Sequence, residues 1–202
     1  MAPGVGFEPT WPQRATGSQG PRHGPQICVS GLGYPGFLNV LAGNISKIFL
    51  KFKLKTEGIL IGMTYRFLEH TSDAYVEAEG DTLEEAFVEA ARGMFDVITD
   101  PSTIEICVKR DITVEAEDLE SLLYSWLEEL LLLFDIEGLV INDFSIIIEK
   151  RSGGYILQGE VRGESFNPSK HPPETDVKAV TYHGMSIKKT NNKYVVRVLF
   201  DI

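Results

Sequence analysis

The chain has 202 residues, enough for one ordinary domain and an appendage, and its 43% hydrophobic and 24% charged residues are typical of a globular protein. Its net charge of −10 argues against general nucleic-acid binding, because phosphate contacts need Lys and Arg. Two cysteines, Cys28 and Cys107, are too few for a disulfide framework or a Cys-based zinc site. No long apolar run or secretory signal indicates a membrane or secreted protein, so we expect a cytoplasmic one.

Residues 1–62 differ from the rest of the chain in composition and charge. They hold 11 of the 19 glycines and 6 of the 10 prolines, a density typical of unstructured chain. Six Lys and Arg against two Glu give this segment a charge of +4, which leaves −14 for the remainder. We therefore predict an unstructured N-terminal extension over 1–62, with Met63 as a candidate initiator, and one domain over 63–202.

The first two predicted elements of this domain are a strand and a helix. Residues 74–79 alternate between apolar and polar side chains, which is typical of a half-buried strand. Thr82 and Glu85 then form a capping-box pattern, the usual start of a helix. Apolar residues recur at helical spacing behind them, and an Asp-Pro pair follows, so we predict an amphipathic helix over 83–98.

A second helix is predicted from Asp118, a suitable N-cap, to about Asp135. Its apolar stripe is wide and includes Trp126, which indicates the central helix of the core. The Ile-, Val- and Thr-rich stretches 103–108 and 111–116 predict a hairpin or two strand pieces with Lys109 and Arg110 between them.

Two hairpins complete the domain. Gly-rich and Asn-Asn turn sequences separate the strands of each pair, and the four predicted strands are 140–150, 154–163, 177–188 and 193–201. The Pro-rich connection 164–176 is predicted as a long loop, and such loops in compact domains are often functional. This order of elements predicts a single α+β domain, with two amphipathic helices packed on a largely antiparallel or mixed β-sheet.

Three stretches of the domain carry a family resemblance. The first reads Phe-Leu-Glu-His-Thr-Ser-Asp over 67–73 and continues with Gly-Asp-Thr-Leu-Glu-Glu-Ala-Phe over 80–87. The second covers 118–130, and the third reads Val-Lys-Ala-Val-Thr-Tyr-His over 177–183, with a chain that ends Leu-Phe-Asp-Ile. In their order and spacing, these stretches make residues 63–202 resemble the archease family, whereas 1–62 has no counterpart.

The resemblance implies an accessory protein rather than an enzyme. Archeases act on an RtcB-type RNA ligase in tRNA splicing, where they promote guanylylation of the ligase and so permit multiple turnover. The family also binds a divalent metal. Its ligands map onto Asp73, Asp201 and the terminal Ile202, which would contribute its main-chain carboxylate.

The residue types agree with such a metal site. Hard cations prefer oxygen ligands, and Asp73 precedes one predicted strand while Asp201 and the chain end close another. If these strands are neighbours, three carboxylates converge and repel one another unless a cation lies between them. Ca²⁺ is the first choice, with Mg²⁺ or Mn²⁺ as alternatives. An Asp in a turn more often bonds its own backbone, and an Asp at a chain end is more often solvated. For Asp73 and Asp201 these alternatives to metal binding stay open.

Further residues are candidates for supporting the metal or contacting the partner. His70 could orient a ligand, while loop position and the resemblance suggest Lys170, Glu174 and Lys178 as contacts to the ligase or its nucleotide. Two other functions stay open: an acidic protein-binding chaperone and a metal-dependent hydrolase. The hydrolase is the weaker, because the sequence shows no nucleophile-and-base arrangement beside the metal ligands.

Overall fold

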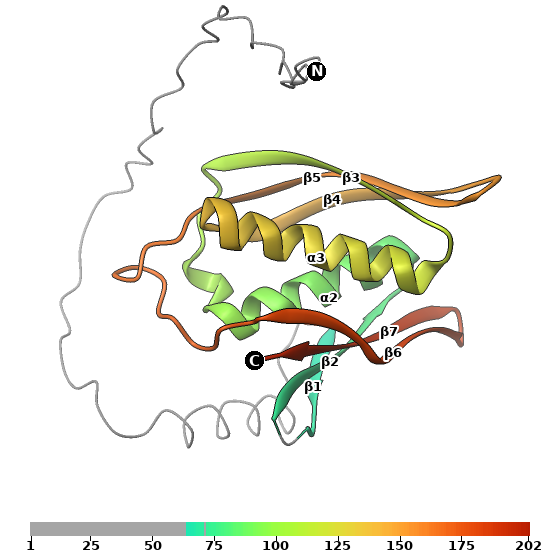
Figure 1. Cartoon of the computed structure of the whole chain (residues 1–202), viewed down its shortest axis with the longest axis horizontal. Helices are drawn as coiled ribbons and strands as arrows, with labels where there is room; N and C mark the ends of the chain where they lie inside the picture. Colours follow the sequence, from blue (N-terminus) through green and yellow to red (C-terminus); the bar gives the residue numbers. More distant parts are fainter. Residues whose placement is uncertain (1–63, 71) are drawn as a thin grey trace, which may run out of the picture. The chain divides into compact units, whose positions relative to one another are not determined.

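The computed structural model describes residues 64–70 and 72–202, so the predictions for 1–62 lie outside the described residues (Figure 1). Two α-helices, one short 3₁₀ helix and seven strands make up this part of the chain. In chain order they are β1 Tyr65–Leu68, β2 Asp73–Gly80, α2 Leu83–Ile98, η1 Pro101–Thr103, β3 Val108–Ala116, α3 Leu119–Glu137, β4 Leu139–Arg151, β5 Gly154–Ser165, β6 Ala179–Thr190 and β7 Lys193–Asp201. Within it, no helix is long and apolar enough to cross a membrane.

The strands form two antiparallel sheets, and the two helices lie between them (Figure 1). One sheet has the order β1-β2-β7-β6 and the other β3-β5-β4. The α+β class with two amphipathic helices is confirmed, but the strands form two sheets rather than one. The reason is the width of the apolar helix surfaces. Helix α2 buries ten of its sixteen residues, more than one sheet can cover, and it contacts β2 and β7 on one side and β4 on the other.

Both helices begin and end where local chemistry dictates. The Glu85 N–H donates to Thr82 Oγ1 at 3.1 Å, and the Glu85 carboxylate accepts from the Thr82 N–H, which is the predicted capping box. The Asp118 carboxylate accepts from the Ser121 N–H at 2.7 Å and caps α3. Helix α3 stops at Gly138, whose φ of 63° is the left-handed conformation that glycine adopts readily.

Trp126 is fully buried in the middle of α3. Its indole N–H donates to the carbonyl of Phe87 on α2 at 3.3 Å, and its ring meets Phe144 of β4 edge-on at 6.2 Å. The side chain therefore ties the second helix both to the first helix and to the three-stranded sheet, which confirms its predicted place in the core.

The predicted pair of strand pieces before α3 is wrong. Strand β3 runs unbroken through Lys109 and Arg110, and residues 104–107 form no strand. The two cations fit inside a strand because their long side chains reach acidic partners: Lys109 Nζ lies 2.8 Å from Glu160, and Arg110 Nη2 lies 2.6 Å from Glu137. A Lys-Arg pair therefore does not mark a turn when carboxylates lie opposite it.

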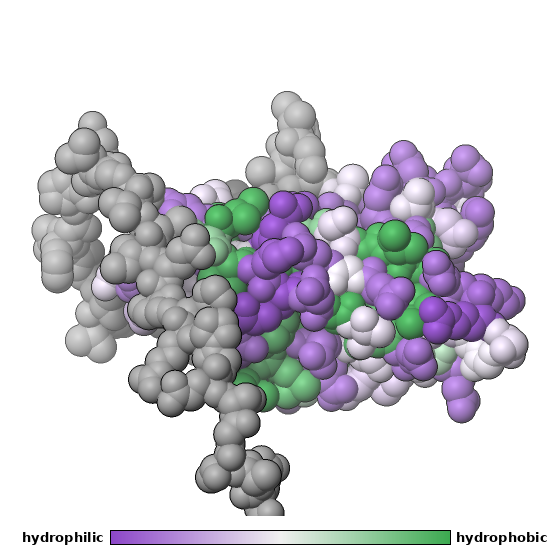
Figure 2. Space-filling model, turned by 90° about the horizontal axis from the view of Figure 1, so that it is seen from above, coloured by the Kyte–Doolittle hydropathy of each residue, from purple (hydrophilic) through white to green (hydrophobic). Residues whose placement is uncertain are grey.

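The outer face of the three-stranded sheet is largely polar. Arg162 joins Asp143 at 2.8 Å and Glu160 at 3.5 Å, next to the Lys109–Glu160 pair. Figure 2, which views the molecule from this side, shows hydrophilic side chains over much of the described surface with hydrophobic groups between them. This face thus alternates charges of both signs, and its cations are matched by carboxylates.

On the four-stranded sheet, Glu77 of β2 is a nearly buried carboxylate held by two arginines. Its side chain is 3% exposed. Arg66 of β1 donates to one carboxylate oxygen, with Nε at 2.8 Å, and Nε of Arg197 on β7 donates to the other at 2.5 Å. Burial by itself would raise the pKa of Glu77, but the hydrogen bonds from Arg197 and Arg66 outweigh it and hold the pKa below its ordinary value.

We expect Glu77→Gln to destabilise the fold by about 1–2 kcal/mol at neutral pH, less than for a fully buried pair because both guanidinium groups keep contact with water. Since the folded-state pKa of Glu77 is lowered, its contribution is present above the pKa of an unfolded Glu and is lost as the pH falls through the folded value. Urea unfolding of both proteins across the acid range measures this. A stability difference that stays constant down to strongly acid pH would contradict it.

Candidate metal centre

The register of β2 and β7 sets Asp73 directly opposite Asp201. Directly opposed residues of an antiparallel pair point to the same face of the sheet, with Cβ atoms about 4.5–5.5 Å apart. The adjoining residues, Ala74 and Phe200, are buried against the helices. Successive side chains of a strand point to opposite faces, so the two aspartates project from the outer face. Two carboxylates 128 positions apart in the sequence are thus brought together by strand pairing alone.

The surroundings of the pair contain little positive charge. His70 Nδ1 lies 3.0 Å from one oxygen of Asp73, and the Ser72 hydroxyl donates to the same oxygen at 3.4 Å. Among residues 64–70 and 72–202, no Lys or Arg forms an ion pair with Asp73 or Asp201. Like charges opposite one another destabilise a sheet, so the two carboxylates have the chemistry to hold a hard cation. That His70 orients Asp73 for such an ion stays a prediction.

The chain end is held in the sheet rather than frayed. The Lys178 N–H donates to the Asp201 carbonyl at 2.9 Å, and Ile202 is half-buried against the hydrophobic core. The backbone at Ile202 is therefore held next to Asp201, where the predicted third oxygen donor would lie. The assignment of Asp73, Asp201 and Ile202 as ligands stays a prediction, and Lys178 is the one candidate contact residue that adjoins them through the backbone.

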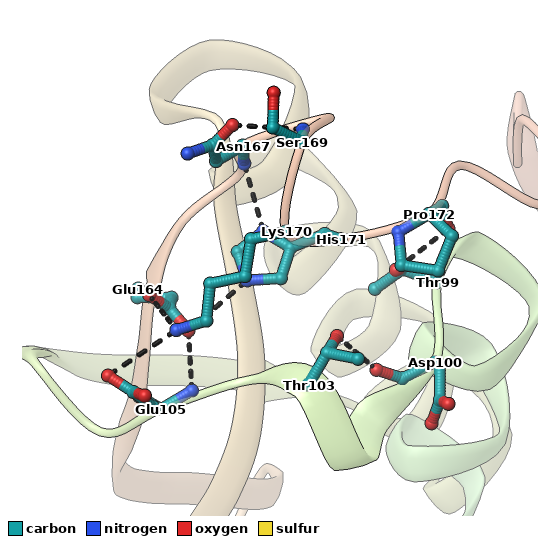
Figure 3. Close-up of polar contacts among 10 residues, drawn as sticks. All are labelled: Thr99, Asp100, Thr103, Glu105, Glu164, Asn167, Ser169, Lys170, His171 and Pro172. Carbon is teal, nitrogen blue, oxygen red and sulfur yellow. Dashed lines mark hydrogen bonds and ion pairs between the residues drawn. The ribbon is translucent and has the colours of Figure 1, made fainter. Parts of the chain in front are cut away.

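A different acidic group lies beneath the loop 164–176. Ligand atoms of Glu105, Cys107 and Glu164 lie within 4.8 Å of one another, and this is the sole such trio in the part of the chain that the structure describes. It could hold a metal ion by its residue types. However, the Lys170 ammonium already lies 2.7 Å from Glu164 and 3.4 Å from Glu105, and Cys107 is not a free thiol. A protein cation thus fills the place that a metal would take (Figure 3).

His171 completes this cluster from a fully buried position. Its Nδ1 accepts from the Asn167 N–H at 2.9 Å, so the proton lies on Nε2, 3.2 Å from Glu164. Burial by itself would raise the pKa of Glu164, but the Glu105 N–H, Lys170 and His171 outweigh it and hold the pKa below its ordinary value. These contacts fasten the loop to the segment that enters β3 (Figure 3).

The start and the end of the loop are held separately. The Asn167 side chain accepts from the Ser169 N–H at 3.0 Å, and the Thr99 hydroxyl donates to the Pro172 carbonyl at 3.0 Å. The Glu174 N–H donates to the Ile98 carbonyl at 3.0 Å, at the end of α2. The structure therefore gives Lys170 partners inside the domain and anchors the backbone at Glu174, while their contact with a partner protein stays a prediction.

Replacing Lys170 by Gln should loosen this loop without unfolding the domain. The change leaves Glu164 and Glu105 without the ammonium between them, and the two carboxylates then repel each other. We expect faster hydrogen exchange at the amides of His171 and Thr175, which bond to Asn167 and Val97, and unchanged exchange in α3. Unchanged protection of the loop amides would show that Lys170 does not hold the loop.

Sequence reasoning did not find this cluster. Glu105 and Glu164 are 59 positions apart, and neither belongs to a recognisable motif. The sequence offered one indication, the proline-rich loop itself. Its backbone N–H and C=O groups cannot pair in a helix or sheet, so they need other hydrogen-bond partners.

Comparison with known proteins decides the family. The sequence model of the Archease protein family matches residues 65–202. This chain belongs to the archease family. It is 53% identical to Protein archease of Pyrococcus furiosus over 135 residues, which cover 66% of this chain and 95% of that one. It is 38% identical to Protein archease of Methanopyrus kandleri over 140 residues, which cover 69% and 100%.

A solved structure supports the archease fold. The solution structure of protein 1598 from Methanobacterium thermoautotrophicum matches with a TM-score of 0.62 and 37% sequence identity. The match covers 69% of this chain and 99% of that one. The two helices and the antiparallel sheets are therefore those of an archease, and the family resemblance predicted from the sequence is confirmed.

Proposed function

We propose that this archease is an accessory activator of an RtcB-type RNA ligase in tRNA splicing, which promotes guanylylation of the ligase and multiple turnover. In this proposal the protein acts on the ligase through the outer face of the four-stranded sheet, at the position where β2 starts and β7 ends. The observation that carries it is the register that sets Asp73 opposite Asp201. Membership of the archease family supports the choice of the ligase as the proposed partner.

The proposed ion is divalent, with Ca²⁺ favoured over Mg²⁺ and Mn²⁺. All donors are oxygens, and carboxylates on two strands and a chain end suit the flexible coordination of calcium. Bound there, the ion would offset the repulsion among the carboxylates and offer a positive centre to a phosphate. The residues of this chain act by holding that centre at a surface: Asp73 and Asp201 bind it, and His70 keeps Asp73 in position through its 3.0 Å contact.

Charge supports a protein partner that itself binds RNA. Residues 63–202 carry −14, and a ligase that handles RNA needs a positively charged surface around its substrate. Opposite potentials accelerate the encounter of two proteins, so the acidic surface favours docking on such a ligase. Lys178, next to Asp201, and Lys170 and Glu174 on the loop are the proposed additional contacts to the ligase or its nucleotide.

The test compares the purified archease with and without the ligase. Stimulated guanylylation of the ligase supports the proposal. Hydrolysis of nucleotides or phosphoesters by the archease alone would favour a metal-dependent hydrolase instead. Protection of unrelated proteins from aggregation, without any effect on guanylylation, would favour the general chaperone.

A further inference from the structure

The β6–β7 hairpin concentrates positive charge on an acidic protein. Residues 178–200 contain five Lys and Arg and no Asp or Glu, whereas the whole chain carries −10. Three of these cations, Lys188, Lys189 and Lys193, lie at the hairpin's closed end, beside the Asn191-Asn192 turn. Both asparagines have positive φ, 49° and 72°, as in the tight two-residue turns that make a narrow ribbon.

These three lysines have no acidic partner in the part of the chain that the structure describes. Within residues 64–70 and 72–202, Lys109, Lys170 and the arginines lie within ion-pair distance of a carboxylate, but none of the hairpin lysines does. Lys189 instead lies over the Tyr194 ring at 4.8 Å. All three side chains are exposed. The hairpin end is therefore a patch of uncompensated positive charge.

The strand register brings two of the lysines together on one face. Lys188 pairs with Val195, and Lys193 pairs with Thr190, so Lys188 and Lys193 are diagonal neighbours on the same side of the ribbon. Such diagonal neighbours lie about 7–8 Å apart, a distance at which like charges repel. An anion bound between them would offset this repulsion. Strand β6 is also an edge of its sheet, which leaves the ribbon accessible from the side.

The spacing of the lysines favours a nucleic acid as the anion. A phosphate backbone presents one charge per nucleotide, so neighbouring phosphates can meet Lys188 and Lys193 on the same face of the ribbon.

We propose that the β6–β7 hairpin, through Lys188, Lys189 and Lys193, contacts the phosphate backbone of the RNA on which the partner ligase acts. The choice of RNA rests on the proposed function. Lys193 lies eight residues from Asp201 on β7, about 27 Å along the strand, so the hairpin contacts a part of the RNA remote from the metal centre. Because the rest of the domain is acidic, the hairpin binds RNA only weakly by itself. Its contribution is to strengthen the binding of RNA by the ligase.

The test measures binding of a labelled single-stranded RNA oligonucleotide to the full-length chain over a range of salt concentrations. The test variant is Lys188→Gln/Lys193→Gln, which spares Lys189 because it covers Tyr194. The matched control is Lys150→Gln/Arg151→Gln, which removes two charges from the tip of the β4–β5 hairpin. We expect the slope of log K against log salt to fall by about 1.4 in the test variant, about 0.7 for each lost phosphate contact, and to be unchanged in the control.

Three results would overturn the inference: no RNA binding by the wild type at low salt, equal slopes in the test and control variants, or equally effective competition by polyglutamate. Guanylylation of the ligase without RNA separates the hairpin from the proposed function. The test variant should stimulate it as the wild type does, and a loss there would show that the hairpin contacts the ligase protein itself. If the wild type gives no stimulation, the proposed function fails, while the RNA titration still decides the role of the hairpin.

Discussion

Trp126→Ala is expected to destabilise the domain by about 3–5 kcal/mol, the usual cost of truncating a large buried aromatic side chain. The indole is fully buried, bonds to the Phe87 carbonyl on α2 and packs edge-on against Phe144 of β4. Its removal leaves a cavity where three elements meet and deletes the indole hydrogen bond that joins α3 to α2. Urea unfolding followed by circular dichroism measures the loss.

The matched control for this change is Leu132→Ala. Leu132 lies on the same helix but is 44% exposed, so its truncation should cost less than about 0.5 kcal/mol. Ligase activation by Trp126→Ala protein should remain in proportion to the folded fraction. A Trp126→Ala protein as stable as the Leu132→Ala protein would show that the indole does not hold the helices together.

Asp73→Asn and Asp201→Asn are each expected to lower calcium affinity by at least roughly tenfold, because affinity for a hard cation depends on the number and charge of its ligands. Both changes keep the side-chain shape and remove one negative charge. Adding residues after Ile202 should weaken binding as well, since a neutral peptide carbonyl then replaces the terminal carboxylate. The β2–β7 backbone hydrogen bonds are unaffected, so the circular dichroism spectrum should not change.

Calorimetric titration of calcium into the full-length proteins measures these affinities. Asp111→Asn is the matched control, because Asp111 is an exposed strand aspartate of β3, in the other sheet. Equal affinity in the native-ended and C-terminally extended proteins would remove Ile202 from the site. Equal affinity in the Asp201→Asn protein as well would leave the metal centre without support.

The two helices and the tight turns could be predicted from the sequence because their causes are local. The Thr82–Glu85 capping box, the Asp118 cap and the Asn191-Asn192 turn each lie within a few residues of the atoms they bond. The side chain of Trp126 could be assigned to the core because a helix with so wide an apolar stripe must be covered on more than one side.

The features that could not be predicted depend on contacts between distant residues. The unbroken course of β3 depends on Glu160 and Glu137, which lie far along the chain from Lys109 and Arg110. The division of the strands into two sheets depends on tertiary packing, because α2 is covered by β2 and β7 on one side and by β4 on the other.

For the candidate site, the residue types and the strand ends could be predicted, but not the pairing of β2 with β7. Alternating apolar residues show that a strand exists and do not identify its neighbour, so the convergence of Asp73 and Asp201 was only conditional. The cluster around Glu164 had no local signal at all, because its members come from the entry to β3, the end of β5 and the loop.

The proposal that the carboxylate pair serves ligase activation is tested most directly by one measurement: guanylylation of the RtcB-type ligase with labelled GTP and calcium, in the presence of wild-type, Asp201→Asn or Asp111→Asn protein. We predict that the wild type and Asp111→Asn stimulate guanylylation equally and that Asp201→Asn, although folded, does not. Equal stimulation by folded Asp201→Asn, or none by the wild type, would contradict the proposed role of this archease.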